Sequence, residues 1–238
     1  MIDPLSKERK NLKLAIRNFS DYLLADASFG LLLLILLFTV FVLPILIEYG
    51  HVNPIFVNSV FLFLFFTGIW SSRNRFIVFF TASLFFLQLV LRLLRFSDTE
   101  FEFYLLERVV GILNMMVFIF LNFSLLFRDF EVNVYRVIGA VNVYLSVAIL
   151  GAFVFEMIFL ITGESIAGQM VLQGLDEDFA SYIYFSLVSL TTVGFGDLYP
   201  TQIMAKMLSV FLSTIGILYP AVVIAKLVAS SALRNKSS

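Results

Sequence analysis

The run Thr-Thr-Val-Gly-Phe-Gly-Asp at residues 191–197 could coordinate a cation with main-chain oxygens. A dehydrated cation needs oxygen ligands, and consecutive backbone carbonyls that face a pore axis can supply them. Turning successive carbonyls the same way requires backbone angles that a Cβ resists, and Gly194 and Gly196 at alternate positions relieve this restriction. Thr192 adds a hydroxyl oxygen below the carbonyls, while Val193 and Phe195 are expected to point away from the axis and pack behind it. The alternative is an ordinary glycine-rich turn between two membrane helices.

The composition of the chain predicts an integral membrane protein. The sequence has 238 residues, 61% of them hydrophobic, and a mean hydropathy of +0.99, whereas soluble domains are nearer 45–50% apolar. A net charge of −1 gives no basic field that would attract nucleic acid. The sequence contains no cysteine, and its single histidine, His51, lies in a short polar connection. No serine–histidine–aspartate or paired-carboxylate pattern points to an enzyme.

Six apolar stretches predict an all-α fold with six transmembrane helices. A helix needs about 20 residues to cross the hydrocarbon, and each stretch is long enough, the second only just. The stretches are Phe29–Ile47, Ile55–Trp70, Phe76–Arg95, Leu105–Phe127, Val137–Thr162 and Gln202–Ala229.

The loop charges predict the orientation, because cytoplasmic loops are rich in lysine and arginine. Cationic residues fall on one side, which places both termini in the cytoplasm of a multi-pass cell-membrane protein: the N-terminal segment, Arg73, Arg75, Arg128, Arg136, Arg234 and Lys236. Acidic residues fall on the other side: Glu48, Asp98, Glu100, Glu102, Glu164, Asp176, Glu177 and Asp178.

A short apolar stretch between the fifth and sixth spans predicts a re-entrant helix. Phe179–Leu190 is too short to cross a membrane, and Asp176-Glu177-Asp178 before it suits a helix start, as caps and against the macrodipole. The helix would aim its C-terminal end, which carries partial negative charge, at the pore centre. Irregular backbone at membrane depth is tolerated only where it is buried or lines water.

Residues 191–197, in this position between a short helix and a long apolar span, closely resemble the selectivity filter of the potassium channel superfamily. The resemblance implies a potassium-selective channel that acts passively. Since the chain has one filter and no repeat of the pore unit, it also implies a homotetramer. Thr192, Val193, Gly194 and Phe195 would supply the oxygen sites for K⁺, and Gly196 and Asp197 would shape the outer mouth; no organic cofactor is implied.

The resemblance also implies an organisation typical of six-span, voltage-gated-like channels. Residues 1–28 would form an N-terminal segment, residues 29–128 a peripheral four-helix domain, and residues 129–238 the pore domain with its two helices, pore helix and filter. Helical spacing of apolar residues among the lysines and arginines of the first segment suggests an amphipathic helix on anionic lipid. A soluble helix packed under the membrane domain is the alternative. Because few residues follow the last span, we expect gating to use the membrane, the pore, this segment or a partner.

Several residues near the filter have expected roles by the same resemblance. Thr191 would support the filter, and Tyr184, where many members carry tryptophan, could hydrogen-bond Asp197. Val188 stands where some members carry glutamate, so that carboxylate pair is absent. Gly216 lies at the offset of the family's hinge glycine and Pro220 follows one turn later, which suggests a bendable inner helix. The alternative is that both residues serve packing.

The fourth span departs from the voltage-sensor pattern. It offers only Arg108, near its outer end, rather than an arginine at every third position, so we expect weak or no voltage dependence. Gln88, Arg92 and Arg95 share one face of the third span and could pair with acidic residues, as a structural ion-pair cluster. The candidate partners are Glu102, Glu107 and Glu156.

Three other functions remain open at this point. A weakly selective cation channel could carry the same filter sequence, because flanking packing can spoil selectivity. A non-conducting regulatory subunit could co-assemble with a different channel. An ion-coupled transporter is disfavoured, since transporters with such pores carry several pore units in one chain, and this chain has one.

Overall fold

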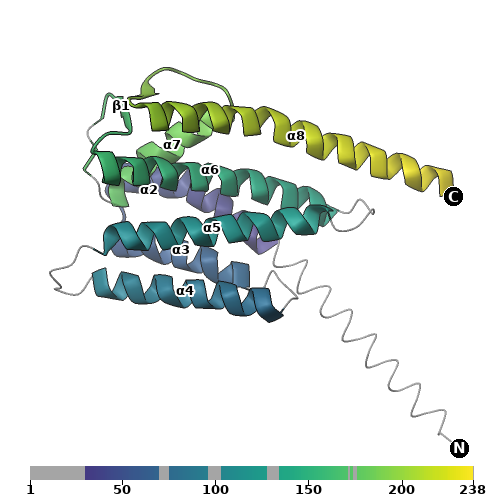
Figure 1. Ribbon diagram of the computed structural model, residues 1–238, viewed down its shortest axis with the longest axis horizontal. Coiled ribbons are helices and arrows are strands. Elements are labelled where there is room, and N and C mark those ends of the chain that lie inside the picture. The colour runs from purple at the N-terminus through teal and green to yellow at the C-terminus, as the bar shows by residue number, and fades with distance from the viewer. Residues whose placement is uncertain are drawn as a thin grey trace, which may run out of the picture.

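The computed structural model describes residues 30–69, 75–95, 103–127, 134–170, 172–173 and 176–237, and its helices lie side by side along one direction (Figure 1). The long helices are Gly30–Glu48, α3 (Pro54–Ile69), α4 (Arg75–Arg95), α5 (Tyr104–Phe127), α6 (Val134–Thr162) and α8 (Ile203–Ser237). Five of them are long and apolar enough to cross a membrane, and α3 contains a shorter apolar helix, Pro54–Thr67. The predicted helical membrane class is supported, with α3 the shortest of the six predicted spans. The predicted N-terminal helix and the loop residues Arg73, Asp98, Glu100, Glu102 and Arg128 lie outside the described residues.

The first helix changes its hydrogen-bond pattern part-way along. Residues Phe38–Val42 form a π-helical turn, η1, and α2 (Leu43–Glu48) continues the helix. Pro44 has no N–H and cannot donate to the carbonyl four residues earlier, and the wider turn lies where that bond is missing. The α2 segment packs against α7 (Phe179–Leu190), the predicted re-entrant helix.

Helix α6 is the central element of the single chain, and α8 lies at its edge. Within their apolar windows, 61% of α6 is buried but only 11% of α8. Gly151 of α6 permits the close approach of its neighbours, because a Cβ there would overlap the Ser186 hydroxyl of α7 and lie 2.8 Å from Leu212 of α8. The apolar surface of α8 is therefore available to lipid or to other copies of the chain.

Three aromatic rings join the peripheral helices to α7. Phe61 of α3 makes edge contacts with Phe153 of α6 and Phe179 of α7, with ring centroids 5.1 and 4.9 Å apart. All three side chains are at most 2% exposed. Edge-to-face rings of this kind add to the energy of burial, so the start of α7 is fixed on both α3 and α6.

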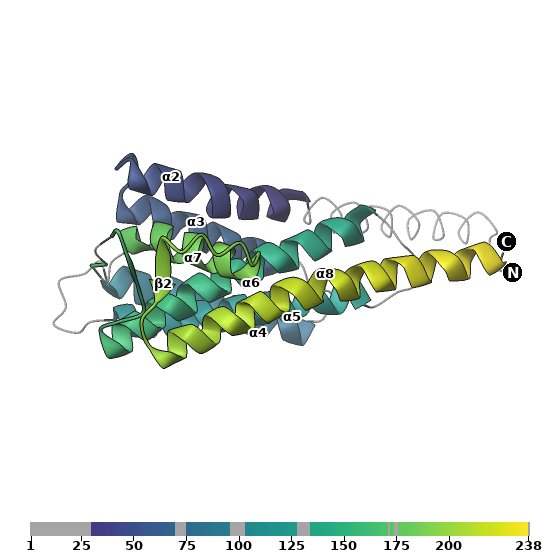
Figure 2. The same ribbon diagram turned by 90° about the horizontal axis from the view of Figure 1, so that it is seen from above.

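A two-stranded antiparallel sheet closes one end of the bundle. Strand β1 (Ile166–Gly168) follows α6, and β2 (Leu198–Pro200) follows residues 191–197, with Ile166 opposite Pro200. Figure 2 shows β2 beside α7 and the start of α8. The sheet thus ties the end of residues 191–197 to the end of α6.

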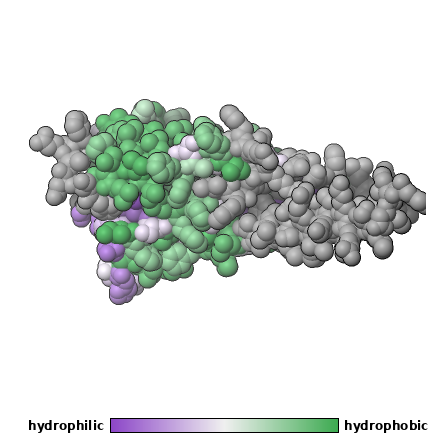
Figure 3. Space-filling model, turned by 90° about the horizontal axis from the view of Figure 1, so that it is seen from below, coloured by the Kyte–Doolittle hydropathy of each residue, from purple (hydrophilic) through white to green (hydrophobic). Residues whose placement is uncertain are grey.

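The described surface is apolar along the helices and polar mainly at the end that carries β1. Figure 3 shows one face on which hydrophobic residues cover most of the described part and hydrophilic residues gather at that end. This distribution fits a protein whose helices lie in hydrocarbon and whose loops reach water.

Candidate ion-conduction site

Helix α7 has the bounds that the sequence predicts for the re-entrant helix, Phe179–Leu190. Most of its side chains are buried, and the Ser186 hydroxyl donates to the Ala148 carbonyl of α6 at 2.6 Å. With 12 residues, α7 is about 18 Å long, shorter than the hydrocarbon thickness. It ends at Leu190 with Thr191 as its C-cap, and residues 191–197 follow as a non-helical segment, called here the filter segment.

The backbone of the filter segment alternates in the sign of φ. Thr192, Gly194 and Gly196 have φ values of 60°, 57° and 82°, while Val193 and Phe195 between them do not have positive φ. Alternating φ signs let successive carbonyls face the same side of the chain, as a column of main-chain oxygen ligands requires. Glycine tolerates positive φ without cost, and Thr192 is the one other described residue that adopts it. The sequence predicted unusual backbone angles at Gly194 and Gly196 but gave no sign of the positive φ at Thr192.

The filter segment is exposed in the single chain. All residues from Thr191 to Asp197 are exposed, including the large side chains of Val193 and Phe195, at 52% and 72%. Both of these side chains border a cavity of about 320 Å³ behind the segment, lined also by α7 and by Val40, Phe41 and Pro44 of the first helix. Both side chains are largely exposed in the single chain, so their packing behind the filter stays a prediction.

Two contacts hold Asp197 at the outer end of the filter segment. The Tyr184 hydroxyl of α7 donates to Asp197 Oδ2 at 2.6 Å, which is the hydrogen bond expected from the sequence. On the other side, a Cβ at Gly168 of β1 would overlap the Asp197 carbonyl oxygen. The Tyr184 hydrogen bond lowers the pKa of the exposed Asp197 carboxyl below its usual value, so Asp197 stays charged at neutral pH.

Strand β1 is a support that the sequence analysis missed. Besides the strand pairing, the Thr201 N–H donates to the Ser165 carbonyl at 2.9 Å, and Gln202 Nε2 donates to the Glu164 carbonyl. The sequence carries no signal for this pairing beyond glycines in the outer loop, because three-residue strands have no recognisable periodicity.

Helix α8 contacts the C-terminal end of α7 directly. The Ser213 hydroxyl donates to the Ser189 carbonyl at 2.8 Å, and a Cβ at Gly216 would overlap the Leu190 carbonyl oxygen. Gly216 therefore has the packing role that the sequence left open. Helix α8 runs unbroken through Gly216 and Pro220 (Figure 2), and bending there during gating stays a prediction.

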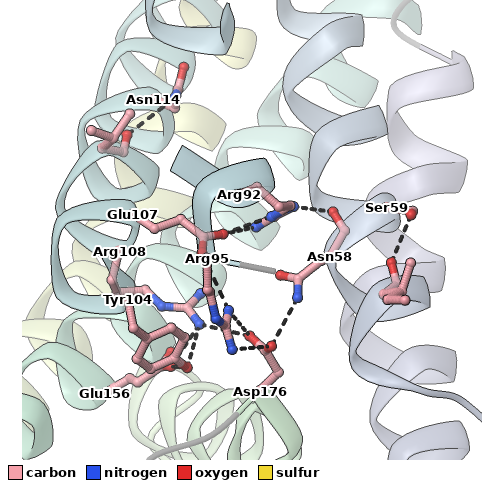
Figure 4. A network of polar contacts seen from close by, with 12 residues as sticks. Asn58, Ser59, Arg92, Arg95, Tyr104, Glu107, Arg108, Asn114, Glu156 and Asp176 are labelled. Atoms are coloured by element: carbon pink, nitrogen blue, oxygen red, sulfur yellow. Dashed lines mark hydrogen bonds and ion pairs between the residues drawn. The ribbon is translucent and has the colours of Figure 1, made fainter. Parts of the chain in front are cut away.

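A second polar region, called here the ion-pair hub, lies between the peripheral helices and the start of α7 (Figure 4). Its members come from α3, α4, α5, α6 and the 3₁₀ turn η2 (Asp176–Asp178). They are Asn58, Arg92, Arg95, Tyr104, Glu107, Arg108, Glu156 and Asp176.

The hub joins the predicted face of α4 to several acidic side chains. Arg92 donates through Nε to Glu107 Oε1 at 2.7 Å, and Arg95 lies 3.3 Å from Glu107 Oε2. Arg108 pairs with Glu156 at 2.7 Å. Glu107 was a predicted partner of this face, but Glu156, also predicted for it, pairs with Arg108 of α5 instead, and the pairing of Arg95 with Asp176 at 2.7 Å was not foreseen.

The structure corrects the expectation that the acidic triplet Asp176-Glu177-Asp178 caps α7. Asp178 occupies the N-cap position but makes no capping hydrogen bond through its side chain; its carboxylate accepts from the Gln173 N–H at 2.9 Å. Asp176 faces the hub instead. Burial disfavours its charged form, but the hydrogen bond from Arg95 and the charge of Arg108 outweigh burial and hold the pKa of Asp176 below its usual value.

The contacts between α7, the filter segment and α8 are all contained in one stretch of sequence. Residues 143–230 match the model of a protein family described as an ion channel. The matched segment includes most of α6 and α8, all of α7 and the filter segment, and it excludes the first helix and α3–α5. No curated protein and no solved structure matches the chain. The match and the apolar helices support a multi-pass membrane protein that acts as an ion channel.

Proposed function

We propose that this protein is a potassium-selective channel in which four copies of the chain surround one pore. K⁺ is the permeating ion, and its ligands would be the main-chain oxygens of Thr192, Val193, Gly194 and Phe195 with the Thr192 hydroxyl. In this proposal Thr191 supports the base of the filter, while Gly196 and Asp197 shape its outer mouth.

The observation that carries the proposal is the alternating sign of φ from Thr192 to Gly196. A simple turn has at most two residues with positive φ, whereas three such residues at alternate positions suit a run of carbonyls facing one side. Potassium is the ion that channels coordinate with such a column of carbonyl oxygens in place of water.

The exposure of the filter segment supports assembly around an axis. Non-helical backbone at membrane depth needs protein or water around it, and in one chain residues 191–197 are all exposed. Four copies would place this segment along a water-filled pore and cover Val193 and Phe195 with neighbouring protein.

The experiment is K⁺ and Na⁺ flux from liposomes that contain the purified protein alone, with the oligomeric state measured in the same preparation. We expect tetramers, flux in K⁺, and a reversal potential near that for K⁺ in mixed K⁺ and Na⁺ gradients. Equal permeability to both ions would indicate a weakly selective cation channel. Tetramers without flux would indicate a regulatory subunit, and a monomer would overturn the proposal.

A further inference from the structure

The Asp176 carboxylate gathers donors from three helices. Its Oδ2 accepts from Asn58 Nδ2 of α3 at 2.9 Å and from Arg95 Nη2 of α4 at 2.7 Å. Its Oδ1 accepts from Arg95 Nη1 at 3.2 Å and from Arg108 Nη2 of α5 at 3.4 Å. Asp176 is only 2% exposed, so these donors replace the water that a free carboxylate would hold (Figure 4).

The charges of the hub balance only when Asp176 is present. Three arginines (Arg92, Arg95 and Arg108) face three carboxylates (Glu107, Glu156 and Asp176). Removing one partner from such a buried set leaves an uncompensated charge, which costs more than the pair contributes. The hub therefore holds Asp176 in one place as long as the peripheral helices stay in register.

Asp176 is also joined to the filter segment through a single rigid element. It begins η2, which leads directly into α7, and α7 ends at Leu190, next to the first residue of the filter segment. Because α7 is largely buried against α6 and α8, a shift at its first turn is transmitted along its axis rather than absorbed. The filter segment is held at its base by this helix and at Asp197 by Tyr184 of the same helix.

We propose that Asp176 is a positioning residue for the filter, through which the peripheral helices α3, α4 and α5 set the placement of α7 and hence the affinity of the filter for K⁺. The inference rests on the proposed function, since it needs a K⁺ site at residues 192–195. Movement of α4 or α5 would then alter conduction at the filter without any charge crossing the membrane.

The test compares melting temperatures of the purified full-length protein in K⁺ and in Na⁺. An ion that binds the folded state raises the melting temperature by an amount that grows with the logarithm of its affinity, so the difference between the two salts reports ion binding at the filter. We expect Asp176→Asn to lower the K⁺ affinity derived from that difference about fivefold or more, the low end of coupling between sites in proteins. A purely structural role would lower the melting temperature equally in both salts and would overturn the inference.

The adjacent Glu177 provides a matched control. It carries the same charge on the same turn but is exposed, so Glu177→Gln removes a negative charge at this end of the bundle without disturbing the hub. We expect its K⁺-dependent melting difference to equal that of the wild type. If Asp176→Asn and Glu177→Gln lost the K⁺-dependent melting difference equally, negative surface charge would explain the attraction of the ion. That result would overturn the positioning role of Asp176.

Arg95→Gln keeps the test decisive if Asp176→Asn does not fold. The Arg95 side chain is 17% exposed, compared with 2% for Asp176, so water reaches the site of Arg95 more readily and its loss should cost less stability. Arg95→Gln should reduce the difference between the melting temperatures in K⁺ and Na⁺ in the same direction as Asp176→Asn. Where both variants fold, the double variant should lose less of the difference between the K⁺ and Na⁺ melting temperatures than the two single variants lose in sum, because residues that act together are not additive. If Arg95→Gln shows the same difference between the K⁺ and Na⁺ melting temperatures as the wild type, the inference is overturned. If the wild type itself melts at the same temperature in K⁺ and Na⁺, the proposed function is overturned.

Discussion

The ion-pair hub and the filter segment are both polar regions among apolar helices, and they satisfy their polar groups in opposite ways. The hub is buried, and arginines and carboxylates of the same chain face one another, as in the pairs Arg92–Glu107 and Arg108–Glu156. The filter segment is exposed from Thr191 to Asp197, and its side chains carry no charge before Asp197.

The difference indicates which part of the protein can form within one chain. Buried charges are tolerated when they are paired and hydrogen-bonded, and the hub reaches that state without a partner. The filter segment is exposed in one chain, and a single filter segment cannot surround an ion. In the proposed channel the hub is therefore complete before assembly, and the filter becomes complete only in the tetramer.

The strongest way to break the comparison is to change a filter glycine. Gly194→Ala places a Cβ at a φ of 57°, which disfavours the alternating backbone, and we expect K⁺ flux in liposomes to fall to the background of protein-free vesicles. Gly163→Ala is the control, because Gly163 has a φ of 79° outside the filter and no atom lies within 4 Å of its Cβ position. Equal loss of flux in the control would show that backbone strain anywhere, rather than in the filter, stops conduction.

The hub should instead control stability. Glu107→Gln leaves Arg92 and Arg95 short of one buried negative charge, and breaking a buried pair in this way costs about 3 kcal/mol. For a chain of this size the melting temperature should fall by about 6–12 °C, measured in Na⁺ so that K⁺ binding does not contribute. Glu48→Gln, at an exposed carboxylate, should melt like the wild type, and an unchanged melting temperature for Glu107→Gln would argue against a stabilising hub.

A smaller effect is expected where the sheet supports the outer mouth. Gly168→Ala would press a methyl group on the Asp197 carbonyl, with strain of about 1–3 kcal/mol for such overpacking. We expect a severalfold faster decline of K⁺ current during sustained opening, measured in planar bilayers. Gly30→Ala adds the same methyl group where no atom lies within 4 Å and should leave the decline unchanged; an unchanged decline in Gly168→Ala would remove β1 from the filter supports.

Tyr184→Phe should shift a pH dependence rather than abolish conduction. The Tyr184 hydrogen bond lowers the pKa of Asp197. The stability that this bond gives to the charged carboxylate is therefore present above the ordinary aspartate pKa and is lost as the pH falls through the lowered pKa. Without the hydroxyl, external acid should reduce the K⁺ current at a higher pH than in the wild type. Tyr199→Phe, at an exposed tyrosine of β2, should titrate as the wild type does, and coincident curves for all three proteins would exclude a role for the bond.

The smallest expected effect is that of voltage. Moving one charge across the whole membrane field is worth about 2.3 kcal/mol per 100 mV, but Arg92, Arg95 and Arg108 all lie in ion pairs within the hub. We expect open probability to change little between −100 and +100 mV, a range over which gating charges act, in single-channel recordings. A steep dependence of open probability on voltage would mean that the ion pairs of the hub rearrange with voltage. The contrast between a hub completed within one chain and a filter completed by assembly would then be wrong.

Much of the candidate site could be predicted from the sequence, because it depends on local properties of the chain. The bounds of α7, Phe179–Leu190, follow from an apolar stretch between acidic residues and glycines. The positive φ of Gly194 and Gly196 follows from the absence of a Cβ. Hydropathy likewise predicted the apolar helices, since the length needed to cross hydrocarbon is a property of each stretch alone.

Only the tertiary structure decided what lies against these local elements. It placed Asp176 beside Arg95 and Asn58, which are 81 and 118 residues away in the sequence, and it put Gly216 against the Leu190 carbonyl and Gly168 against Asp197. Charge pairing and close backbone approach depend on which helices and strands are neighbours, and residue type does not specify the neighbour. Backbone conformation is a property of single residues, whereas the partner of a buried charge is a property of the whole fold.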